Sequence, residues 1–566
     1  MPGELLVKYK NSASVQKHST ARNKAKLIKP FKALGIERWV LSKNQKLNDV
    51  LQQLKSNPDV EIVEPNYRRY PRAIRAAASN YPNNSSRLQQ AGLTSLWGKS
   101  VVNGAPKVKI AVFDDGFDID HEDLAANIVD SFDALDNDNN ARPEICVDEN
   151  GQFIPDDNGD PFTEHHGTEV LGVVGAVRNN GIGIDGASDN AELYPVRLGC
   201  NYTVAAELAA VDWAIQKGVD IVSISYGGPM YSELERVAFQ KLVTENILVV
   251  AAAGNDDVDN DRIIDYPSGL DLPNVFTIAG TNGANELAEW SQWGQTTVDL
   301  AAPGENFATT NLSSGLQKYV QSVSGTSFSS PMVAGVLASL MTRDPIQSDV
   351  IPPVYRARAA LMLAAKRFSV TSKAKLAGDG YIDANAAWSE LNSLQPVIVV
   401  KSIKIDDSEN GNNNGEVDPG ESIKLRLQLE NQGTDADYFQ ATVESSDIPM
   451  TSYSFEDSLK GFTPATHSYV SREYTIPVDF GDVTQQQDIL FSVTILGDYS
   501  GGSFSTTRYF TLDTGSLESG APVESSIRKN DDNQDELHFY HIDVPTGMKS
   551  LTIRLNPSLN GASHDL

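Results

Sequence analysis

Three short segments of the sequence carry the residue types that acyl transfer requires. Asp114 ends the apolar run in VKIAVFDDG, His166 opens a helical pattern in HHGTEVLGVVGA, and Ser327 lies in a Gly-Thr-Ser turn in SVSGTSFSSPMVAG. Acyl transfer needs an activated hydroxyl, a base within hydrogen-bond reach, and an anion that orients the base. Each residue alone is a weak signal, but all three stand at predicted strand or helix ends, in the order Asp, His, Ser. We therefore expect one catalytic site built from these three side chains.

The stretch around Asp114 holds more acidic groups than such a site needs. Residues 110–124, IAVFDDGFDIDHEDL, contain six carboxylates and His121. One alternative is a metal-dependent hydrolase that uses this cluster. We expect instead that Asp114 is the only catalytic carboxylate here and that His121 is a surface loop residue. His165, which precedes His166, is expected to be a partly exposed neighbour and not the base.

The elements that must position these residues are those of a parallel α/β sheet. Nearly all-apolar runs at 108–113, 219–225, 247–253 and 275–280 alternate with helical patterns. Strands that are covered by helices on both faces read in this way. Ser327 is expected just before a helix that has Pro331 in its first turn.

The length and texture of the sequence divide the chain into several domains. A chain of 566 residues is too long for one hydrophobic core. After residue 396 the apolar residues alternate at period two, which predicts a β-sandwich. We expect a small α/β domain at 1–75, an α/β domain with a parallel sheet at 76–395, a β-sandwich at 396–513, and the start of a further, truncated β domain at 514–566.

Composition excludes several classes of protein. The net charge of −29 argues against nucleic acid or an anionic membrane as partner, and no apolar run has the length of a membrane span. Residues 1–75 carry a net charge of +10 and the remainder −39. This asymmetry suggests a basic segment that docks on an acidic body, although a merely soluble basic segment is the alternative. Two cysteines, Cys146 and Cys200, exclude a disulfide scaffold; one bridge or two free thiols both remain open.

The segments VFDDG, HGTEVLG and SGTSFSSPMVAG resemble the triad motifs of the subtilisin-like serine proteases, the subtilases. By this resemblance the triad is Asp114, His166 and Ser327. The segment VVAAAGND is similar to the family's oxyanion segment, which implies Asn255 as a donor beside the Ser327 amide. Asp115 stands where many members have Ser or Thr, as in the kexin-like branch.

The same resemblance implies residues that contact substrate and an N-terminal propeptide. SISYGG resembles the strand that pairs with extended substrate, and DYPSGLDLPNV resembles the opposite wall of the primary pocket. The implied substrate contacts are Ser225, Tyr226, Gly227 and Asp265. A carboxylate at Asp265 would favour Arg or Lys in the substrate, although a side chain turned to solvent or calcium is the alternative. Residues 1–75 resemble the inhibitory propeptide, which would be cleaved between Arg72 and Asn80.

Two segments resemble calcium sites of the family. VRNNGIGIDGAS is similar to a calcium loop, and FDALDNDNN to a kexin-type site, with a solvated acidic turn as the alternative for each. Oxygen ligands of this kind favour Ca²⁺ over zinc. The implied ligands are Asp123, Asn180 and the carbonyls of Arg178, Ile182 and Ile184 for the first site, and Asp133, Asp138 and Asn140 for the second.

Together these features predict a secreted serine endopeptidase of bacterial type that is stabilised by calcium. We expect a monomer that is made as a propeptide-inhibited zymogen and acts on polypeptides, with its signal peptide absent from this sequence. The alternative is a secreted binding or adhesive protein whose subtilisin-like core is catalytically inactive.

Overall fold

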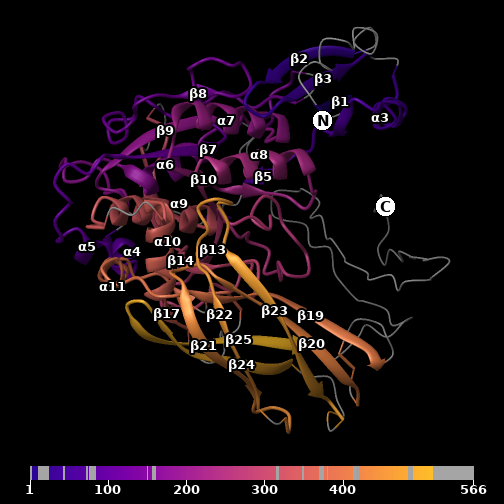
Figure 1. Ribbon diagram of the computed structural model, residues 1–566. Coiled ribbons are helices and arrows are strands. Elements are labelled where there is room, and N and C mark those ends of the chain that lie inside the picture. Colours follow the sequence, from indigo (N-terminus) through magenta and orange to yellow (C-terminus); the bar gives the residue numbers. More distant parts are fainter. Residues whose placement is uncertain are drawn as a thin grey trace, which may run out of the picture.

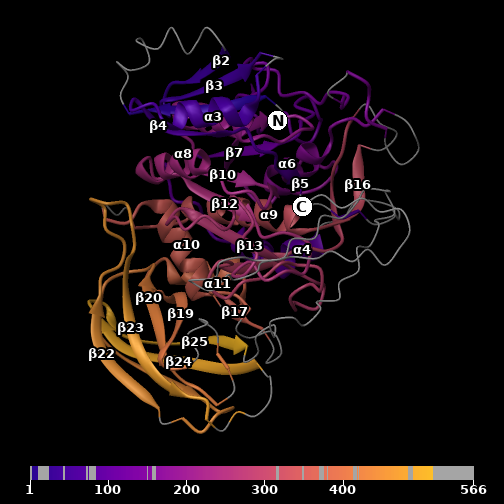
Figure 2. The same ribbon diagram turned by 90° about the vertical axis from the view of Figure 1, so that its right-hand side faces the viewer.

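The structure is a computed structural model that describes residues 3–513 with several gaps. The gaps are residues 11–24, 43–44, 72–73, 76–84, 149–150, 156–160, 314–317, 347–349, 369–374, 379, 412–416, 419, 451, 482 and 484–487. The predicted start of a further β domain at 514–566 lies outside the described residues. Figures 1 and 2 show three parts in a row, with an N-terminal sheet and the C-terminal sheets at opposite ends of a central α/β body.

The N-terminal part is a four-stranded antiparallel sheet with the order β2-β3-β1-β4. Its strands and helix are β1 (Glu4–Tyr9), β2 (Ala25–Phe31), β3 (Ile36–Leu41), α3 (Leu47–Lys55) and β4 (Val60–Pro65). Successive side chains of a strand point to opposite faces of a sheet. Leu5 and Val7 therefore pack with α3 on one face, whereas Leu6 and Ile36 join the core of the central body on the other.

The central sheet has nine strands in the order β17-β18-β14-β13-β12-β10-β7-β9-β8. Neighbours from β18 to β8 run parallel, and only the β17–β18 pair at one edge is antiparallel. This confirms the predicted parallel α/β class. The strands are β7 (Val108–Asp114), β8 (Phe132–Asp133), β9 (Ala191–Arg197), β10 (Ile221–Ile224), β12 (Leu248–Ala252), β13 (Val275–Thr281), β14 (Leu300–Pro303), β17 (Lys366–Arg367) and β18 (Gly380–Tyr381).

Helices cover both faces of this sheet, which is why its strands are apolar throughout. Along β7, Ile110 and Val112 pack with α6 (His166–Gly175) and α9 (Thr326–Met341). Ala111 and Phe113 pack on the opposite face with α7 (Val204–Lys217) and α8 (Glu233–Thr244). The remaining described helices are α4 (Ser85–Gln90), α5 (Leu93–Leu96), α10 (Pro353–Leu363) and α11 (Ala384–Glu390).

The C-terminal part consists of two antiparallel sheets, β19-β20-β23 and β22-β21-β24-β25, that share one apolar core. Their strands are β19 (Ile398–Asn410), β20 (Ser422–Asn431), β21 (Ala436–Ser445), β22 (Tyr453–Leu459), β23 (Val470–Asp479), β24 (Asp488–Tyr499) and β25 (Gly502–Asp513). Buried Arg358 on α10 bonds both to Asp299 of the central body, at 3.0 Å, and to Gln432, at 3.2 Å. This contact links the C-terminal part to the body, beside which its sheets lie in Figure 1.

Two small sheets join the connection after the N-terminal part to the central body. β5 (Tyr70–Pro71) pairs with β11 (Tyr226–Gly227), and β6 (Ile74–Arg75) pairs with β16 (Tyr319–Ser324), whose other neighbour is β15 (Phe307–Thr310). All of these pairings are antiparallel. Among the described residues, no helix is both long and apolar enough to cross a membrane.

Candidate active site

The three predicted catalytic residues come from element ends that meet on one side of the central sheet. Asp114 is the last residue of β7, His166 the first residue of α6, and Ser327 the second residue of α9. Parallel strands present their carboxyl ends at a common edge, which is where such sheets hold their sites. All three side chains are buried.

Asp114 and His166 form a direct pair. His166 Nδ1 lies 2.7 Å from Asp114 Oδ1, and the hydroxyl of Tyr202 donates to the same oxygen at 2.7 Å. Burial lowers the pKa of His166, but the Asp114 carboxylate outweighs it and raises the pKa to about 9. A carboxylate on Nδ1 fixes the imidazole so that Nε2 is the atom available for proton transfer.

Ser327 is turned toward a strand and not toward the histidine. Its Oγ donates to the Ser225 carbonyl at 3.3 Å, and the buried His166 Nε2 has no hydrogen-bond partner in the described part of the chain. The Phe328 ring lies 6.2 Å from the His166 ring, between centroids. Hydrogen bonds between a nucleophile and its base often form only in the substrate complex. This geometry is therefore compatible with a triad in which the bond between Ser327 Oγ and His166 Nε2 has not formed.

The helix that carries Ser327 begins earlier than predicted. The prediction that Ser327 precedes the helix is wrong, because α9 starts at Thr326 and Pro331 lies inside it. Proline has no N–H to donate to the carbonyl four residues back, which is that of Ser327. The Ser225 hydroxyl donates to this carbonyl instead, at 3.0 Å. Ser225 therefore holds Ser327 through two bonds of opposite sense.

Asn255 is oriented by the same helix. Its Oδ1 accepts from the Thr326 amide at 2.9 Å and from the Thr326 hydroxyl at 3.0 Å. The oxygen branch of the amide is thus engaged next to Ser327, and the nitrogen branch is the one that can donate to an oxyanion.

Asp115 has a structural task that the sequence did not indicate. His165, the residue before α6, makes no side-chain cap. The Asp115 carboxylate takes that place: Oδ2 accepts from the His165 and His166 amides, both at 3.1 Å, and Oδ1 accepts from Gly167 at 2.7 Å. Burial, followed by the charge of Asp114, raises the pKa of Asp115. In the sequence, the only sign of this contact was that Asp115 stands where many members of the resembled family have Ser or Thr.

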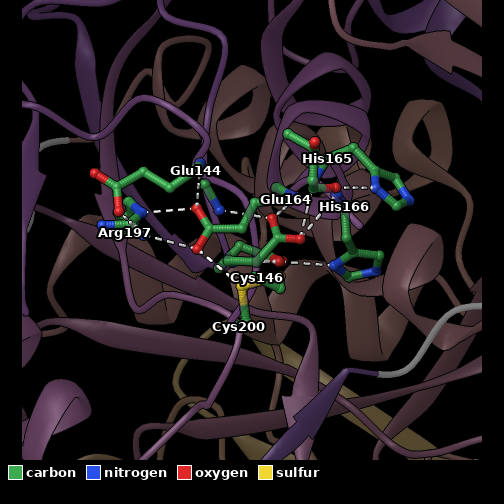
Figure 3. The surroundings of a disulfide bond; sticks show 12 residues. Glu144, Cys146, Glu164, His165, His166, Arg197 and Cys200 are labelled. Atoms are coloured by element: carbon green, nitrogen blue, oxygen red, sulfur yellow. Dashed lines mark hydrogen bonds and ion pairs between the residues drawn. A yellow bond between two sulfur atoms is a disulfide. The ribbon is translucent and has the colours of Figure 1, made fainter. Parts of the chain in front are cut away.

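A disulfide lies in the same region as His166 (Figure 3) and decides the question left open by the sequence. Cys146 and Cys200 are bridged, with their Cα atoms 5.7 Å apart. Next to the bridge, the Glu164 carboxylate accepts from Arg197 at 2.7 Å. Burial is the main cause that raises the pKa of Glu164 to about 7. The bridge ties the segment before His166 to the end of β9.

The two other histidines differ in how well they were predicted. His165 is half-buried, and its Nδ1 contacts the Thr163 carbonyl at 2.7 Å. The prediction of a surface position for His121 is wrong, because the side chain is fully buried. His121 Nε2 lies 3.0 Å from the Lys318 carbonyl, and the Asp123 amide donates to Nδ1 at 3.1 Å.

The first predicted calcium loop is brought together by the fold. Asp123 Oδ1 accepts from Asn180 Nδ2 at 2.6 Å, and Oδ2 accepts from the Ile184 amide at 2.9 Å. Burial raises the pKa of Asp123. Which end of the Asn180 amide faces the carboxylate follows from hydrogen bonding, and rotation of this amide would turn an oxygen inward. A buried carboxylate beside an Asn amide is a donor set that fits a hard cation.

The donor set of the second predicted site does not fit calcium. Asp133 Oδ2 is paired with Arg197 at 2.5 Å, and its Oδ1 accepts from the Leu135 amide at 2.7 Å. Asn140 Oδ1 accepts from Arg142 at 3.0 Å, and Asp138 Oδ1 accepts from the Asn140 amide at 2.7 Å. The Asp133 carboxylate differs from that of Asp123 in having a guanidinium that already neutralises its charge, so this cluster does not fit a cation cage.

The predicted substrate strand is paired with the connecting segment. Tyr226 pairs with Pro71 and Gly227 with Tyr70, in antiparallel register. Asp265 is buried, and its charge is among those that raise the pKa of Arg69 on that segment. Three of the four residues implied for substrate binding therefore interact with residues 69–71, whereas Ser225 contacts Ser327.

Comparisons with known proteins show which family the sequence matches. Residues 105–388 match the model of the subtilase family, and residues 1–66 match that of the fervidolysin N-terminal prodomain. The minor extracellular protease Epr of Bacillus subtilis is 30% identical over 61% of this chain and 49% of its own length. Subtilisin amylosacchariticus of a Bacillus subtilis subspecies is 27% identical over 59% of this chain and 77% of its own length. The chain thus spans about half the length of the first relative.

Two solved structures share the fold. Fervidolysin of Fervidobacterium pennivorans, described as a keratinolytic enzyme related to subtilisin, gives a TM-score of 0.55 at 17% identity and covers 90% of this chain and 76% of its own. The epidermin leader peptide processing serine protease of Staphylococcus aureus gives 0.53 at 21% identity and covers 69% of this chain and 98% of its own. At these identities the likeness is one of fold alone.

Proposed function

The chain belongs to the subtilase family of serine endopeptidases, and we propose that it hydrolyses peptide bonds through Asp114, His166 and Ser327. The observation that carries this proposal is the buried His166–Asp114 pair of 2.7 Å beside the start of α9, which bears Ser327. A rival function, an inactive binding protein, is disfavoured because each catalytic group of the motif is present.

Each residue has one part in the proposed mechanism. Ser327 Oγ attacks the scissile carbonyl while His166 Nε2 accepts its proton and later returns it to the leaving amine. Asp114 holds the His166 tautomer and stabilises the imidazolium. Asn255 Nδ2 and the Ser327 amide donate to the oxyanion; the loss of one such donor lowers kcat by a factor of about 10²–10³.

The N-terminal part, with a domain boundary near residue 75, acts in this proposal as an intramolecular inhibitor. Its Glu64 carboxylate accepts from the Ser232 hydroxyl and from the Glu233 and Leu234 amides at the start of α8. Further along the chain, β5 pairs with β11 and β6 pairs with β16. Since β5 and β6 pair with two different strands of the site, we infer that the maturation cut falls between residues 71 and 75.

Calcium is proposed at the first loop only. Asp123, the Asn180 side chain and the carbonyls of Arg178, Ile182 and Ile184 would hold the ion, which would neutralise the buried carboxylate and stabilise the loop. Chelation is therefore expected to lower thermal stability first and activity as a consequence.

Secretion and the remaining domain boundaries are also proposals. The Cys146–Cys200 bridge favours an oxidising compartment, and the names of two relatives describe them as extracellular. We place the catalytic domain at 76–395 and a β-sandwich of accessory role at 396–513, in a monomer that acts on polypeptides.

A fluorophosphonate probe tests the proposed function. The mature protein should be labelled in a 1:1 ratio, and peptide mapping should locate the adduct at Ser327. A native protein that remains unlabelled, or an adduct at another residue, would overturn the proposal. An unlabelled but folded protein would favour the inactive binding protein.

A further inference from the structure

The connecting segment, residues 66–71, is bonded to the central body through its backbone at two places, an isolated bridge between Arg68 and Thr203 and the β5–β11 pair. On one side, the Val204 amide donates to the Tyr67 carbonyl at 3.0 Å, and the Arg69 amide donates to the Tyr202 carbonyl at 2.7 Å. On the other side, the segment continues as β5 against β11. Extended peptides that bind as an added β-strand are held in this way. Their main-chain hydrogen bonds give affinity, and pockets for their side chains give specificity.

This course leads directly to the nucleophile. β11 begins at Tyr226, and the preceding residue, Ser225, holds Ser327 through two hydrogen bonds. The segment therefore has the position and direction that an extended substrate would need in order to reach the catalytic serine. Its side chains identify what each pocket along this path accepts.

Arg69 fills a buried acidic pocket. Its side chain is fully buried, and its Nε and Nη2 donate to Glu235 Oε1 at 2.9 and 2.6 Å. Glu207 lies beside this pair and accepts from the Tyr226 hydroxyl at 2.9 Å. Burial lowers the pKa of Arg69, but the charges of Glu235 and Glu207 outweigh burial and raise this pKa.

Two buried carboxyl groups, those of Glu207 and Glu235, share one guanidinium in this pocket. Glu207 and Glu235 are fully buried, and their carboxyl groups contact each other through a side-chain hydrogen bond. Burial and the neighbouring Glu235 raise the pKa of Glu207 well above its usual range. Buried charges are costly unless they are paired. Removal of Arg69 would leave these carboxylates without their guanidinium.

We propose that Glu207 and Glu235 form a substrate pocket that selects arginine at the position of Arg69, the residue just before the one that pairs with Gly227. The inference rests on the proposed peptidase function and adds a substrate class to it. With a cut after Arg72, this is the fourth residue before the scissile bond. A planar guanidinium offers two donors to one carboxylate, which a lysine ammonium cannot reproduce in the same geometry.

Peptide hydrolysis by the mature wild-type protein gives the first test. Internally quenched peptides carry residues 66–75, with Ala at position 68 to prevent a shifted register, and with Arg, Lys or Leu at position 69. We expect kcat/KM to be about a hundredfold higher for Arg than for Leu, with Lys between them, as for a desolvated charge pair. Equal values for Arg and Leu would overturn the inference.

Variants of the pocket give the second test. Glu235→Gln should reduce the Arg-to-Leu ratio of kcat/KM at least tenfold, chiefly through a lower kcat/KM for the Arg peptide. Glu245→Gln is the matched control, because it removes the same charge from an exposed position at the end of the same helix. Both peptides should be cleaved by the control as by the wild type. An equal loss for both peptides in Glu235→Gln would indicate a structural role and contradict the inference.

A variant that fails to mature does not end the test. If Glu235→Gln blocks folding because Arg69 loses its partner, the combined change Arg69→Leu with Glu235→Leu removes both charges and should restore maturation with a preference for Leu. Failure of the proposed function is distinct: no peptide is then cleaved and Ser327 is not labelled. Cleavage without an arginine preference refutes the pocket alone.

Discussion

Replacement of Asp115 by asparagine should change both the stability of the site and the pH at which it works. The carboxylate accepts from four amides, those of Gly116, His165, His166 and Gly167. An asparagine side chain would turn an NH₂ group toward at least one pair of these donors. Loss of a helix cap costs about 1–2 kcal/mol, so Asp115→Asn should lower the free energy of unfolding by about that amount.

The same change removes a negative charge near the catalytic base. Asp115 is one of the carboxylates that raise the pKa of His166. A nearby charge shifts a pKa by about one unit or more, and the general base must be neutral. The acidic limb of kcat/KM against pH should therefore move to lower pH by about one unit in Asp115→Asn.

Asp120→Asn is the control for this experiment. Asp120 lies in the same segment, and its exposed carboxylate is paired with Arg142 at 2.8 Å. The Asp120→Asn variant also loses one negative charge, but Asp120 does not bond to the amides at the start of α6. Both its unfolding midpoint in urea and the acidic limb of its kcat/KM against pH should therefore stay near those of the wild type. Unfolding should be measured in a Ser327→Ala background, which prevents self-digestion. An acidic limb of Asp115→Asn that is unchanged, or that moves to higher pH, would refute the reasoning.

Three further predictions concern stability. The double variant Cys146→Ser with Cys200→Ser should lower the free energy of unfolding by about 4 kcal/mol, because the bridge joins positions 54 residues apart. A reductant should lower the Tm of the wild type but not that of the double variant. Burial raises the pKa of Asp259 to about 6 from 3.8, so stability should fall as pH rises from about 4 through 6, by about 3 kcal/mol. Urea unfolding of Asp259→Asn should lack this loss. EDTA should lower the wild-type Tm by several degrees and leave that of Asp123→Ala unchanged; an equal fall in both would exclude the Asp123 loop as the calcium site.

Much of the fold could be predicted because its signals are local. The apolar runs that form β7, β10, β12 and β13 follow from a sheet that helices cover on both faces. The beginning of α9 could not be predicted in the same way, because a proline is typical of a first turn and Pro331 lies deeper in the helix. The Ser225 hydroxyl, which is 102 residues away from Ser327, replaces the bond that proline cannot make. No local pattern contains that compensation.

The sequence by itself determined the family, because its short motifs match the subtilases, and it predicts Asp114, His166 and Ser327 as the residues that do the chemistry. Only the tertiary structure decided that the two cysteines are bridged and that His121 is buried. It also decided that Glu207 and Glu235 converge on Arg69. The physical reason is that periodicity and turn chemistry act over a few residues. Ion pairs, by contrast, depend on packing between elements that the chain joins only through long connections, such as the 166 residues between Arg69 and Glu235.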